Sequence, residues 1–116
     1  MSEPIRAAET NHYLWGEVCD GWRLASGVQL SVIEERMPPG SSEQRHFHSQ
    51  ARQFFYVLAG ELTMEVEGRV HGLKSGQGIE ITPGERHQAR NPEDAGEDVR
   101  FLVISTPTSQ GDRTNA

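Results

Sequence analysis

The sequence predicts an all-β protein built as a barrel or a sandwich, and three observations support this fold class. Short segments in which apolar and polar residues alternate, the pattern of half-buried strands, recur along the chain. Gly and Pro residues, which favour turns, separate these segments at intervals of roughly ten residues. No segment shows the period of an amphipathic helix.

The length fits one small domain. The chain has 116 residues, enough to bury a core but too few for two domains. The apolar residues gather in the middle of the chain, whereas both ends are polar. We therefore expect one barrel domain over residues 13–106, a flexible N-terminal arm over 1–12 and a C-terminal tail over 107–116.

Charge and composition exclude several classes of partner. The net charge of −6 and the pI near 5.3 argue against nucleic acid and anionic membranes, because both require a basic patch. The longest apolar run, Phe54–Ala59, is far too short to span a membrane, and the N-terminus lacks the apolar region of a signal peptide. The single cysteine, Cys19, rules out an intrachain disulfide. We expect a cytoplasmic protein.

The first half of the predicted barrel contains two candidate strand regions. The segment 13–22 holds both tryptophans, which we expect to pack the first strands onto the barrel, and its Asp20-Gly21 pair favours a tight turn. Val28, Leu30 and Val32 alternate with polar residues. This alternation predicts a strand that continues to Met37 and ends at Pro38.

The second half predicts a meander of antiparallel strands. Leu62, Met64 and Val66 form one alternating segment, and Glu67-Gly68 is typical of a hairpin turn. Ile79 and Ile81 form another, which ends at a turn over residues 83–85. The last strand, 99–104, is apolar on both faces, and we expect it to be buried.

The stretch between two of these regions carries candidate metal ligands. His46 and His48 are two residues apart, so on a strand both imidazoles leave the same face of the sheet. Gln53 follows at the start of an apolar run. If Gln53 points into the barrel, Phe55 and Val57 point inward with it. The outward residues are then Phe54, Tyr56 and Leu58.

Two motifs in this part of the chain resemble those of the cupin superfamily. The first reads Gly40-x5-His46-x-His48-x4-Gln53-x6-Gly60, with Gln53 where the family usually has Glu. The second reads Gly76-x5-Thr82-Pro83-Gly84-x2-His87-x3-Asn91, with Thr82 where the family has proline. A lone His-x-His pair is weak evidence, but its combination with a third histidine and correctly spaced Gly, Pro and Asn residues is specific.

The resemblance implies a fold, a cofactor and an assembly. The fold would be the double-stranded β-helix, the jelly-roll-like barrel of cupins. One divalent transition metal ion (Zn, Fe, Mn, Ni, Co or Cu) would be held by His46, His48, Gln53 and His87. Such ions bind imidazole nitrogen and oxygen donors, and four protein ligands leave coordination positions open for a ligand. The apolar outer face of the run after Gln53 would be covered by a second copy of the chain in a homodimer.

The resemblance leaves three functions open, all with a small-molecule ligand. The first is a metal-dependent lyase or isomerase acting on an oxygenated metabolite such as a sugar acid or keto sugar. It is favoured because a neutral Gln53 amide leaves a bound ion more charge with which to polarise a carbonyl. The alternatives are an iron-dependent dioxygenase and a non-catalytic binding or sensing barrel. Arg36 and Arg100 are candidate contacts for a charged substrate, although a solvated surface position is the favoured interpretation for both. Arg45, Arg52 and Arg86 should point away from the metal.

Overall fold

Strands make up most of the computed structural model, which describes residues 2–116. Apart from one short 3-10 helix, η1 (Ala7–Glu9), the regular elements of this part of the chain are all strands. They are β1 (Asn11–Trp15), β2 (Cys19–Ser26), β3 (Ser31–Met37), β4 (Ser41–Ser42), β5 (His46–Phe47), β6 (Arg52–Ala59), β7 (Glu61–Val66), β8 (Arg69–Lys74), β9 (Gly78–Ile81), β10 (His87–Asn91), β11 (Val99–Thr106) and β12 (Thr114–Asn115). The all-β prediction is therefore confirmed. Within residues 2–116, no helix is long and apolar enough to cross a membrane.

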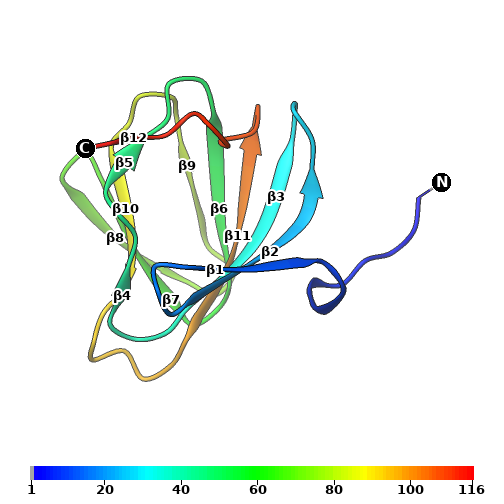
Figure 1. Cartoon of the computed structure of the whole chain (residues 1–116). Coiled ribbons are helices and arrows are strands. Elements are labelled where there is room, and N and C mark those ends of the chain that lie inside the picture. Colours follow the sequence, from blue (N-terminus) through cyan, green and yellow to red (C-terminus); the bar gives the residue numbers. More distant parts are fainter. Residues whose placement is uncertain (1) are drawn as a thin grey trace.

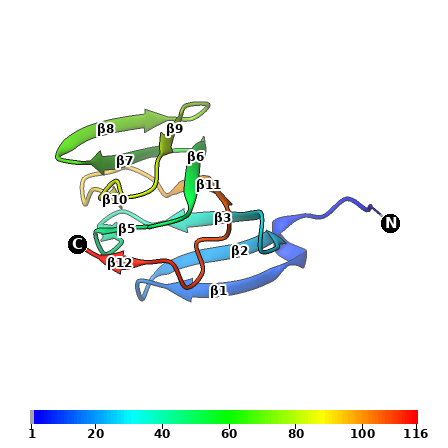
Figure 2. The same cartoon turned by 90° about the horizontal axis from the view of Figure 1, so that it is seen from above.

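The strands form two sheets that face each other. One has the order β1-β2-β3-β11-β6-β9, and the other has the order β12-β5-β10-β7-β8 with β4 paired to β10. Figure 1 shows β6, β11 and β3 along one wall of the barrel and β5, β10 and β8 along the opposite wall. In the view from above, β7 and β8 lie at one side and β1 and β2 at the other (Figure 2). This arrangement leaves an interior between the two walls.

Alternate residues of the strands fill the core from both walls. On β6, Gln53, Phe55 and Val57 are buried, whereas Phe54, Tyr56 and Leu58 are 39%, 38% and 40% exposed, as the alternation predicts. The buried apolar side chains at the centre include Met37, Leu62, Met64, Val99 and Phe101. The core therefore draws its residues from strands of both sheets.

Two predicted turns are confirmed. Glu67 and Gly68 connect β7 to β8, and both have positive φ angles (49° and 87°), the geometry of a two-residue hairpin. Gly84 follows Pro83 with a φ of 88°, in a turn closed by the hydrogen bond from the Glu85 amide to the Thr82 carbonyl at 3.2 Å. This second turn leads directly into β10 and so sets the position of His87.

The turn predicted at Asp20-Gly21 is wrong. These residues lie inside β2, and the chain turns earlier, at Gly16 and Glu17, which have φ angles of 55° and 73°. Gly21 has a packing role instead of a turning role. A Cβ atom there would overlap the ring of Tyr13, so the glycine makes room for that ring on the neighbouring strand.

The strand predicted from Val28 begins later, at Ser31. Val28 and Leu30 are 76% and 48% exposed and lie in the loop between β2 and β3, which the bond from the Gly27 amide to the Leu30 carbonyl closes at 2.9 Å. The alternation of apolar and polar residues runs through this loop into β3, so it did not show where the strand begins. The last strand, β11, extends to Thr106, and only its inner face is fully buried.

Residues of the expected arm and tail also contact the barrel. Asn11 and His12 belong to the edge strand β1. The Thr108 amide bonds to the Val28 carbonyl at 2.9 Å, and β12 pairs with β5. The C-terminal segment therefore crosses the open end of the barrel (Figure 1) and reaches the strand that carries His46.

Candidate metal centre

Three histidines from two neighbouring strands and the loop after β5 meet inside the barrel. His46 on β5 and His87 on β10 are direct partners in the sheet, and His48 follows His46 by two residues. One ring nitrogen from each histidine can be chosen so that the three nitrogens all lie within 4.8 Å of one another. All three side chains are buried. They lie close enough to coordinate one metal ion.

The backbone orients each imidazole for this purpose. The Nδ1 atoms of His46, His48 and His87 lie 2.7, 2.6 and 3.0 Å from backbone carbonyl oxygens of Gln44, Asp112 and Glu85. A carbonyl only accepts hydrogen bonds, so Nδ1 carries the proton and Nε2 keeps its lone pair. The Nε2 atoms of His48 and His87 are buried without a hydrogen-bond partner. Buried polar atoms rarely lack partners, so these two are suited to a metal ion.

Gln53 on β6 is also buried, in the wall of the same cavity. Its Nε2 atom donates a hydrogen bond to the Ser105 hydroxyl at 3.0 Å, which orients the amide. Its Oε1 atom is buried and has no partner. The amide oxygen thus adds a third unsatisfied acceptor to the two histidine nitrogens.

The electrostatic environment keeps the histidines neutral. Burial is the main cause that lowers the pKa of each of the three imidazoles, although the bonds from Nδ1 to backbone carbonyls oppose it. The pKa of His46 falls to about 3. At pH 7 the three rings are therefore in the neutral form that binds metal ions.

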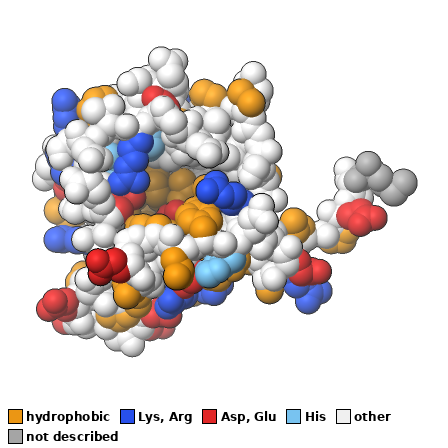
Figure 3. Space-filling model, in the orientation of Figure 1, with side chains coloured by type: hydrophobic (Ala, Val, Ile, Leu, Met, Phe, Trp, Pro, Cys, Tyr) orange, Lys and Arg blue, Asp and Glu red, His pale blue; other side chains and the backbone are white. Residues whose placement is uncertain are grey.

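His46, His48 and Gln53 line a cavity of about 510 Å³, and His87 lies buried behind them. Ile33, Phe55 and Val103 provide apolar wall, and the C-terminal segment contributes residues 108–111. The ionisable lining residues besides His46 and His48 are Arg23, Glu35, Glu43 and Arg113. In the space-filling view, hydrophobic side chains are visible inside the hollow and basic side chains lie on both sides of its opening (Figure 3).

Sequence reasoning missed the charged residues of this cavity. Glu35 lies on β3 between the inward positions 33 and 37, so the alternation contained a signal for it: a charge in an inward row. Burial raises the pKa of Glu35 to about 8 and that of Glu43 to about 7, although the Ala89 amide, which donates to Glu43 Oε1 at 2.9 Å, opposes the second shift. Arg113 lies in a polar segment without strand pattern, and nothing in the sequence singles it out.

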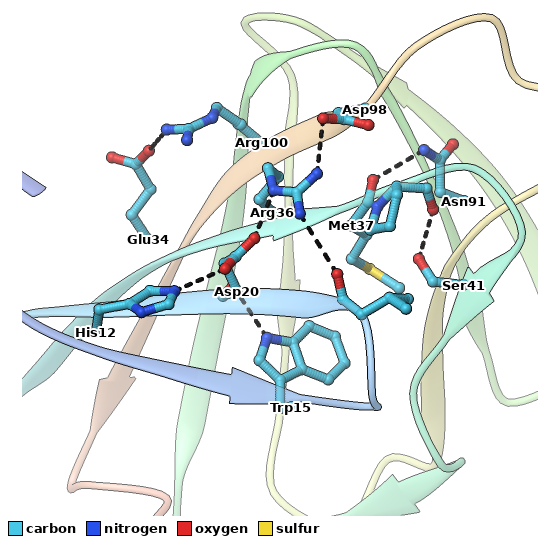
Figure 4. Close-up of polar contacts among 12 residues, drawn as sticks. His12, Trp15, Asp20, Glu34, Arg36, Met37, Ser41, Asn91, Asp98 and Arg100 are labelled. Carbon is cyan, nitrogen blue, oxygen red and sulfur yellow. Dashed lines mark hydrogen bonds and ion pairs between the residues drawn. The ribbon is translucent and has the colours of Figure 1, made fainter. Parts of the chain in front are cut away.

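Arg36 and Arg100, proposed from the sequence as substrate contacts, lie on the outer face of the first sheet (Figure 4). Arg36 pairs with Asp20 at 2.6 Å and with Asp98 at 2.8 Å, and Arg100 pairs with Glu34 at 2.6 Å. Neither lines the cavity. The favoured interpretation, a solvated outer face, is confirmed for both, because they alternate with inward residues of their strands. Arg45, Arg52 and Arg86 also lie outside the cavity, as expected.

Asp112 connects the C-terminal segment to the site and was not foreseen. Its carboxylate accepts the backbone N–H groups of Ser49, Gln50 and Ala51 at 3.0, 2.8 and 2.8 Å. Its own carbonyl accepts the Nδ1 proton of His48. Burial raises the pKa of Asp112, but the three amides outweigh it and hold the pKa below its ordinary value. One residue thus fixes both His48 and the loop that follows it.

Comparison with known proteins gives one family match. A family model described as "Cupin domain" matches residues 33–105. "Polyketide synthase CurC" of Streptomyces cyaneus is 32% identical over 71 residues, which are 61% of this chain and 45% of that protein. The chain thus spans about half the length of this relative or less.

Two solved structures share the fold. The polyketide cyclase RemF from Streptomyces resistomycificus superimposes with a TM-score of 0.80 at 22% identity, covering 93% of this chain and 81% of that one. A Klebsiella pneumoniae protein with a double-stranded β-helix domain superimposes with a TM-score of 0.81 at 20% identity, covering 100% and 98%. At these identities the likeness establishes the fold, a double-stranded β-helix.

Proposed function

Because the chain belongs to the cupin family, we propose that it holds one divalent transition metal ion and acts on a small oxygenated metabolite in the cavity. One observation carries this proposal. Two histidine nitrogens and an amide oxygen, all buried, lack any hydrogen-bond partner in the described chain, and the histidines belong to a cluster whose nitrogens lie within 4.8 Å of one another. A metal ion satisfies all three at once, whereas water in an apolar-walled site satisfies them less well.

The proposed ligands are His46, His48, His87 and Gln53. Three neutral imidazoles and one amide oxygen suit Zn, Fe, Mn, Ni, Co or Cu, and they leave positions open for a ligand from the cavity. An ion bound there would supply Lewis-acid polarisation of a carbonyl or hydroxyl oxygen. The donor set is neutral throughout, which favours this chemistry over reactions that stabilise a more oxidised metal.

The proposed reaction is of the lyase or isomerase type, on a sugar acid or keto sugar. Ile33, Phe55 and Val103 exclude water from one side of the bound molecule, and Arg23 and Arg113 are positioned to attract an anionic group. The names of CurC and RemF connect those proteins with polyketides, which share with keto sugars a carbonyl beside an acidic C–H bond. A carbonyl substrate is the common element.

Metal analysis and a substrate panel test this function. Protein purified without chelator or affinity nickel is analysed for each transition metal, then incubated with sugar acids and keto sugars and followed by NMR. We expect conversion by the metal-loaded protein and none after chelation. Absence of any conversion by metal-loaded protein contradicts the proposed reaction. Oxygen consumption by the iron-loaded form would instead indicate a dioxygenase, and tight calorimetric binding without turnover a sensing barrel.

Gln53→Glu is expected to strengthen metal binding. The new carboxylate places a negative charge beside the ion, and even in a partly screened site this attraction should raise affinity at least about tenfold. Competition against a chromogenic chelator measures the change. Gln29→Glu adds the same charge in the exposed loop between β2 and β3 and serves as the matched control. Equal affinities in the two variants would mean that Gln53 is not a ligand.

We also propose that the chain forms a homodimer through the outer face of β6 and β11. Phe54, Tyr56 and Leu58 are partly exposed there, and Leu102 and Ile104 lie beside them as strand partners of Tyr56 and Phe54. An apolar stripe across two adjacent strands is typical of an interface. Tyr56→Lys is expected to convert dimers to monomers in light scattering, whereas Val70→Lys, on β8, should not. A monomeric wild type would refute this.

A further inference from the structure

One carboxyl group stands inside the barrel without a role in its construction. Glu35 occupies the inward row of β3, between Ile33 and the core residue Met37. The ladder hydrogen bonds of β3 to β2 and β11 are made by the backbone and do not need this side chain. The carboxyl lines the same cavity as His46, His48 and Gln53. A charge in such a place costs desolvation free energy, which a core residue would avoid.

A tyrosine on the edge of the same sheet lies next to this residue. Tyr13, Gly21 and Glu35 are consecutive partners across β1, β2 and β3. A Cβ atom at Gly21 would lie only 2.6 Å from the Tyr13 hydroxyl oxygen, so the glycine creates the space in which this hydroxyl lies over the direct strand partner of Glu35. The guanidinium of Arg23 covers the ring at 4.5 Å. Three strands thus position one hydroxyl.

The charges that face Glu35 make it a proton carrier near neutral pH. Burial and the negative charge of Glu43 raise its pKa to about 8, opposed by Arg113 and by the Tyr13 hydroxyl. Cys19 is the other ionisable group nearby. The pKa of Tyr13 is itself raised to about 12 by burial, so its hydroxyl keeps its proton. Among the described residues Glu35 has no ion-pair partner within 4.0 Å.

Glu43 is the other carboxyl of the cavity, but it is committed to the scaffold. Its Oε1 atom accepts the Ala89 amide of β10 at 2.9 Å, so proton transfer at Glu43 would disturb the strand that carries His87. Glu35 makes no such bond to the backbone of either sheet. Of the two carboxyls, Glu35 is the one free to exchange a proton with a molecule in the cavity.

We propose that Glu35 is the catalytic acid–base residue of this cavity and that Tyr13 is its positioning residue, an assignment that rests on the proposed function. A carbon next to the substrate carbonyl gives its proton to a carboxylate oxygen of Glu35. The electron pair of the broken C–H bond forms a C=C bond, and the carbonyl π pair moves onto the carbonyl oxygen. Return of the proton to the same carbon completes an exchange. In a hydroxyketone, return of the proton to the former carbonyl carbon completes an isomerisation when the proton of the neighbouring hydroxyl passes to the former carbonyl oxygen. No oxidant or reductant is needed.

Hydrogen–deuterium exchange at carbon tests the assignment. Metal-loaded wild type, Glu35→Gln and Glu34→Gln are incubated in D₂O with dihydroxyacetone or ethyl acetoacetate, and the loss of the α-proton signals is followed by ¹H NMR. Glu35→Gln should slow exchange about 100-fold or more at unchanged metal content, because general acid–base groups contribute factors of this size. Glu34 lies next in sequence but on the outer face, paired with Arg100, so its variant should match wild type.

Tyr13→Phe tests the positioning role through the pH profile. Exchange needs the deprotonated carboxylate, so the wild-type rate should rise with pH to a plateau. The midpoint should lie below the pKa of about 8 that Glu35 has in the metal-free cavity, because a bound cation favours the carboxylate. Loss of the hydroxyl that stabilises the carboxylate should shift this midpoint to higher pH. The ¹³C NMR titration of the Glu35 carboxyl should report the same midpoints without any substrate.

Stability gives a further readout that does not depend on turnover. The folded-state pKa of Glu35 lies above its ordinary value of 4.5, so folding favours the protonated form. Its contribution to stability is therefore present below about pH 4.5 and is lost as the pH rises toward 8. Glu43 titrates in an overlapping range, so only the difference between wild type and Glu35→Gln isolates Glu35. We expect urea unfolding of Glu35→Gln to depend less on pH.

The outcomes separate this assignment from the proposed function. Metal-dependent exchange that survives in Glu35→Gln overturns the role of Glu35 and leaves the function standing. Exchange that Glu35→Gln abolishes but chelation does not would uphold Glu35 and overturn the metal-dependent function. Wild-type protein that exchanges neither probe at any pH overturns both. A Glu35 carboxyl that titrates at its ordinary pKa in the metal-free protein also overturns the assignment.

Discussion

His87→Ala is expected to abolish binding of the proposed metal ion. His87 is buried, its Nδ1 proton is held by the Glu85 carbonyl, and its Nε2 atom has no hydrogen-bond partner in the described chain. The loss of a residue that merely supports a ligand weakens metal binding about 10–100-fold, so loss of a ligand should weaken it by more than about 100-fold. Element analysis after dialysis should then find almost no bound transition metal.

His71→Ala is the matched control for this experiment. His71 lies on β8, outside the cavity, and its removal should leave metal content unchanged. The truncation of a buried ring also removes packing, so circular dichroism of both variants must show the strand content of wild type. Full metal stoichiometry at the same site in folded His87→Ala would contradict the ligand assignment.

Asp112→Ala is expected to weaken metal binding about 10–100-fold although Asp112 is not a proposed ligand. Its carboxylate holds three amides of the loop 49–51, and its carbonyl holds the Nδ1 proton of His48. Without the carboxylate the loop and the segment lose the bonds that keep them together. His48 then lacks a fixed ring orientation, and the ion must be bound at an entropic cost.

Chelator competition measures the affinity of Asp112→Ala, and amide relaxation of Ser49, Gln50 and Ala51 measures the mobility of the loop. Asp94→Ala, in the exposed acidic loop between β10 and β11, removes the same charge elsewhere and is the control. The explanation requires both effects together. Wild-type affinity with a mobile loop, or weak binding with a rigid one, would show that Asp112 does not act by orienting His48.

The sequence by itself determined the fold class and the family, and it singled out the three histidines and Gln53 of the candidate site. Strand alternation depends only on the two-residue period of the backbone, so the inward positions of Gln53, Phe55 and Val57 could be derived before the structure was known. Gly84 and His87 could be placed because turn chemistry is local. Where local rules overlap, as at Asp20-Gly21 inside β2, the packing of a neighbouring strand decided the outcome.

Only the tertiary structure decided which further residues share the cavity. A period of two separates the faces of β3 but does not say which face becomes the interior, so Arg36 was considered for the site and Glu35 was not. Asp112 contacts His48 across 64 residues of sequence, from a polar segment with no periodic pattern of its own. Such contacts arise from the closure of the barrel and the return of the chain across its mouth. No local sequence preference brings Asp112 to His48, because their approach in space is set by the packing of all the strands between them.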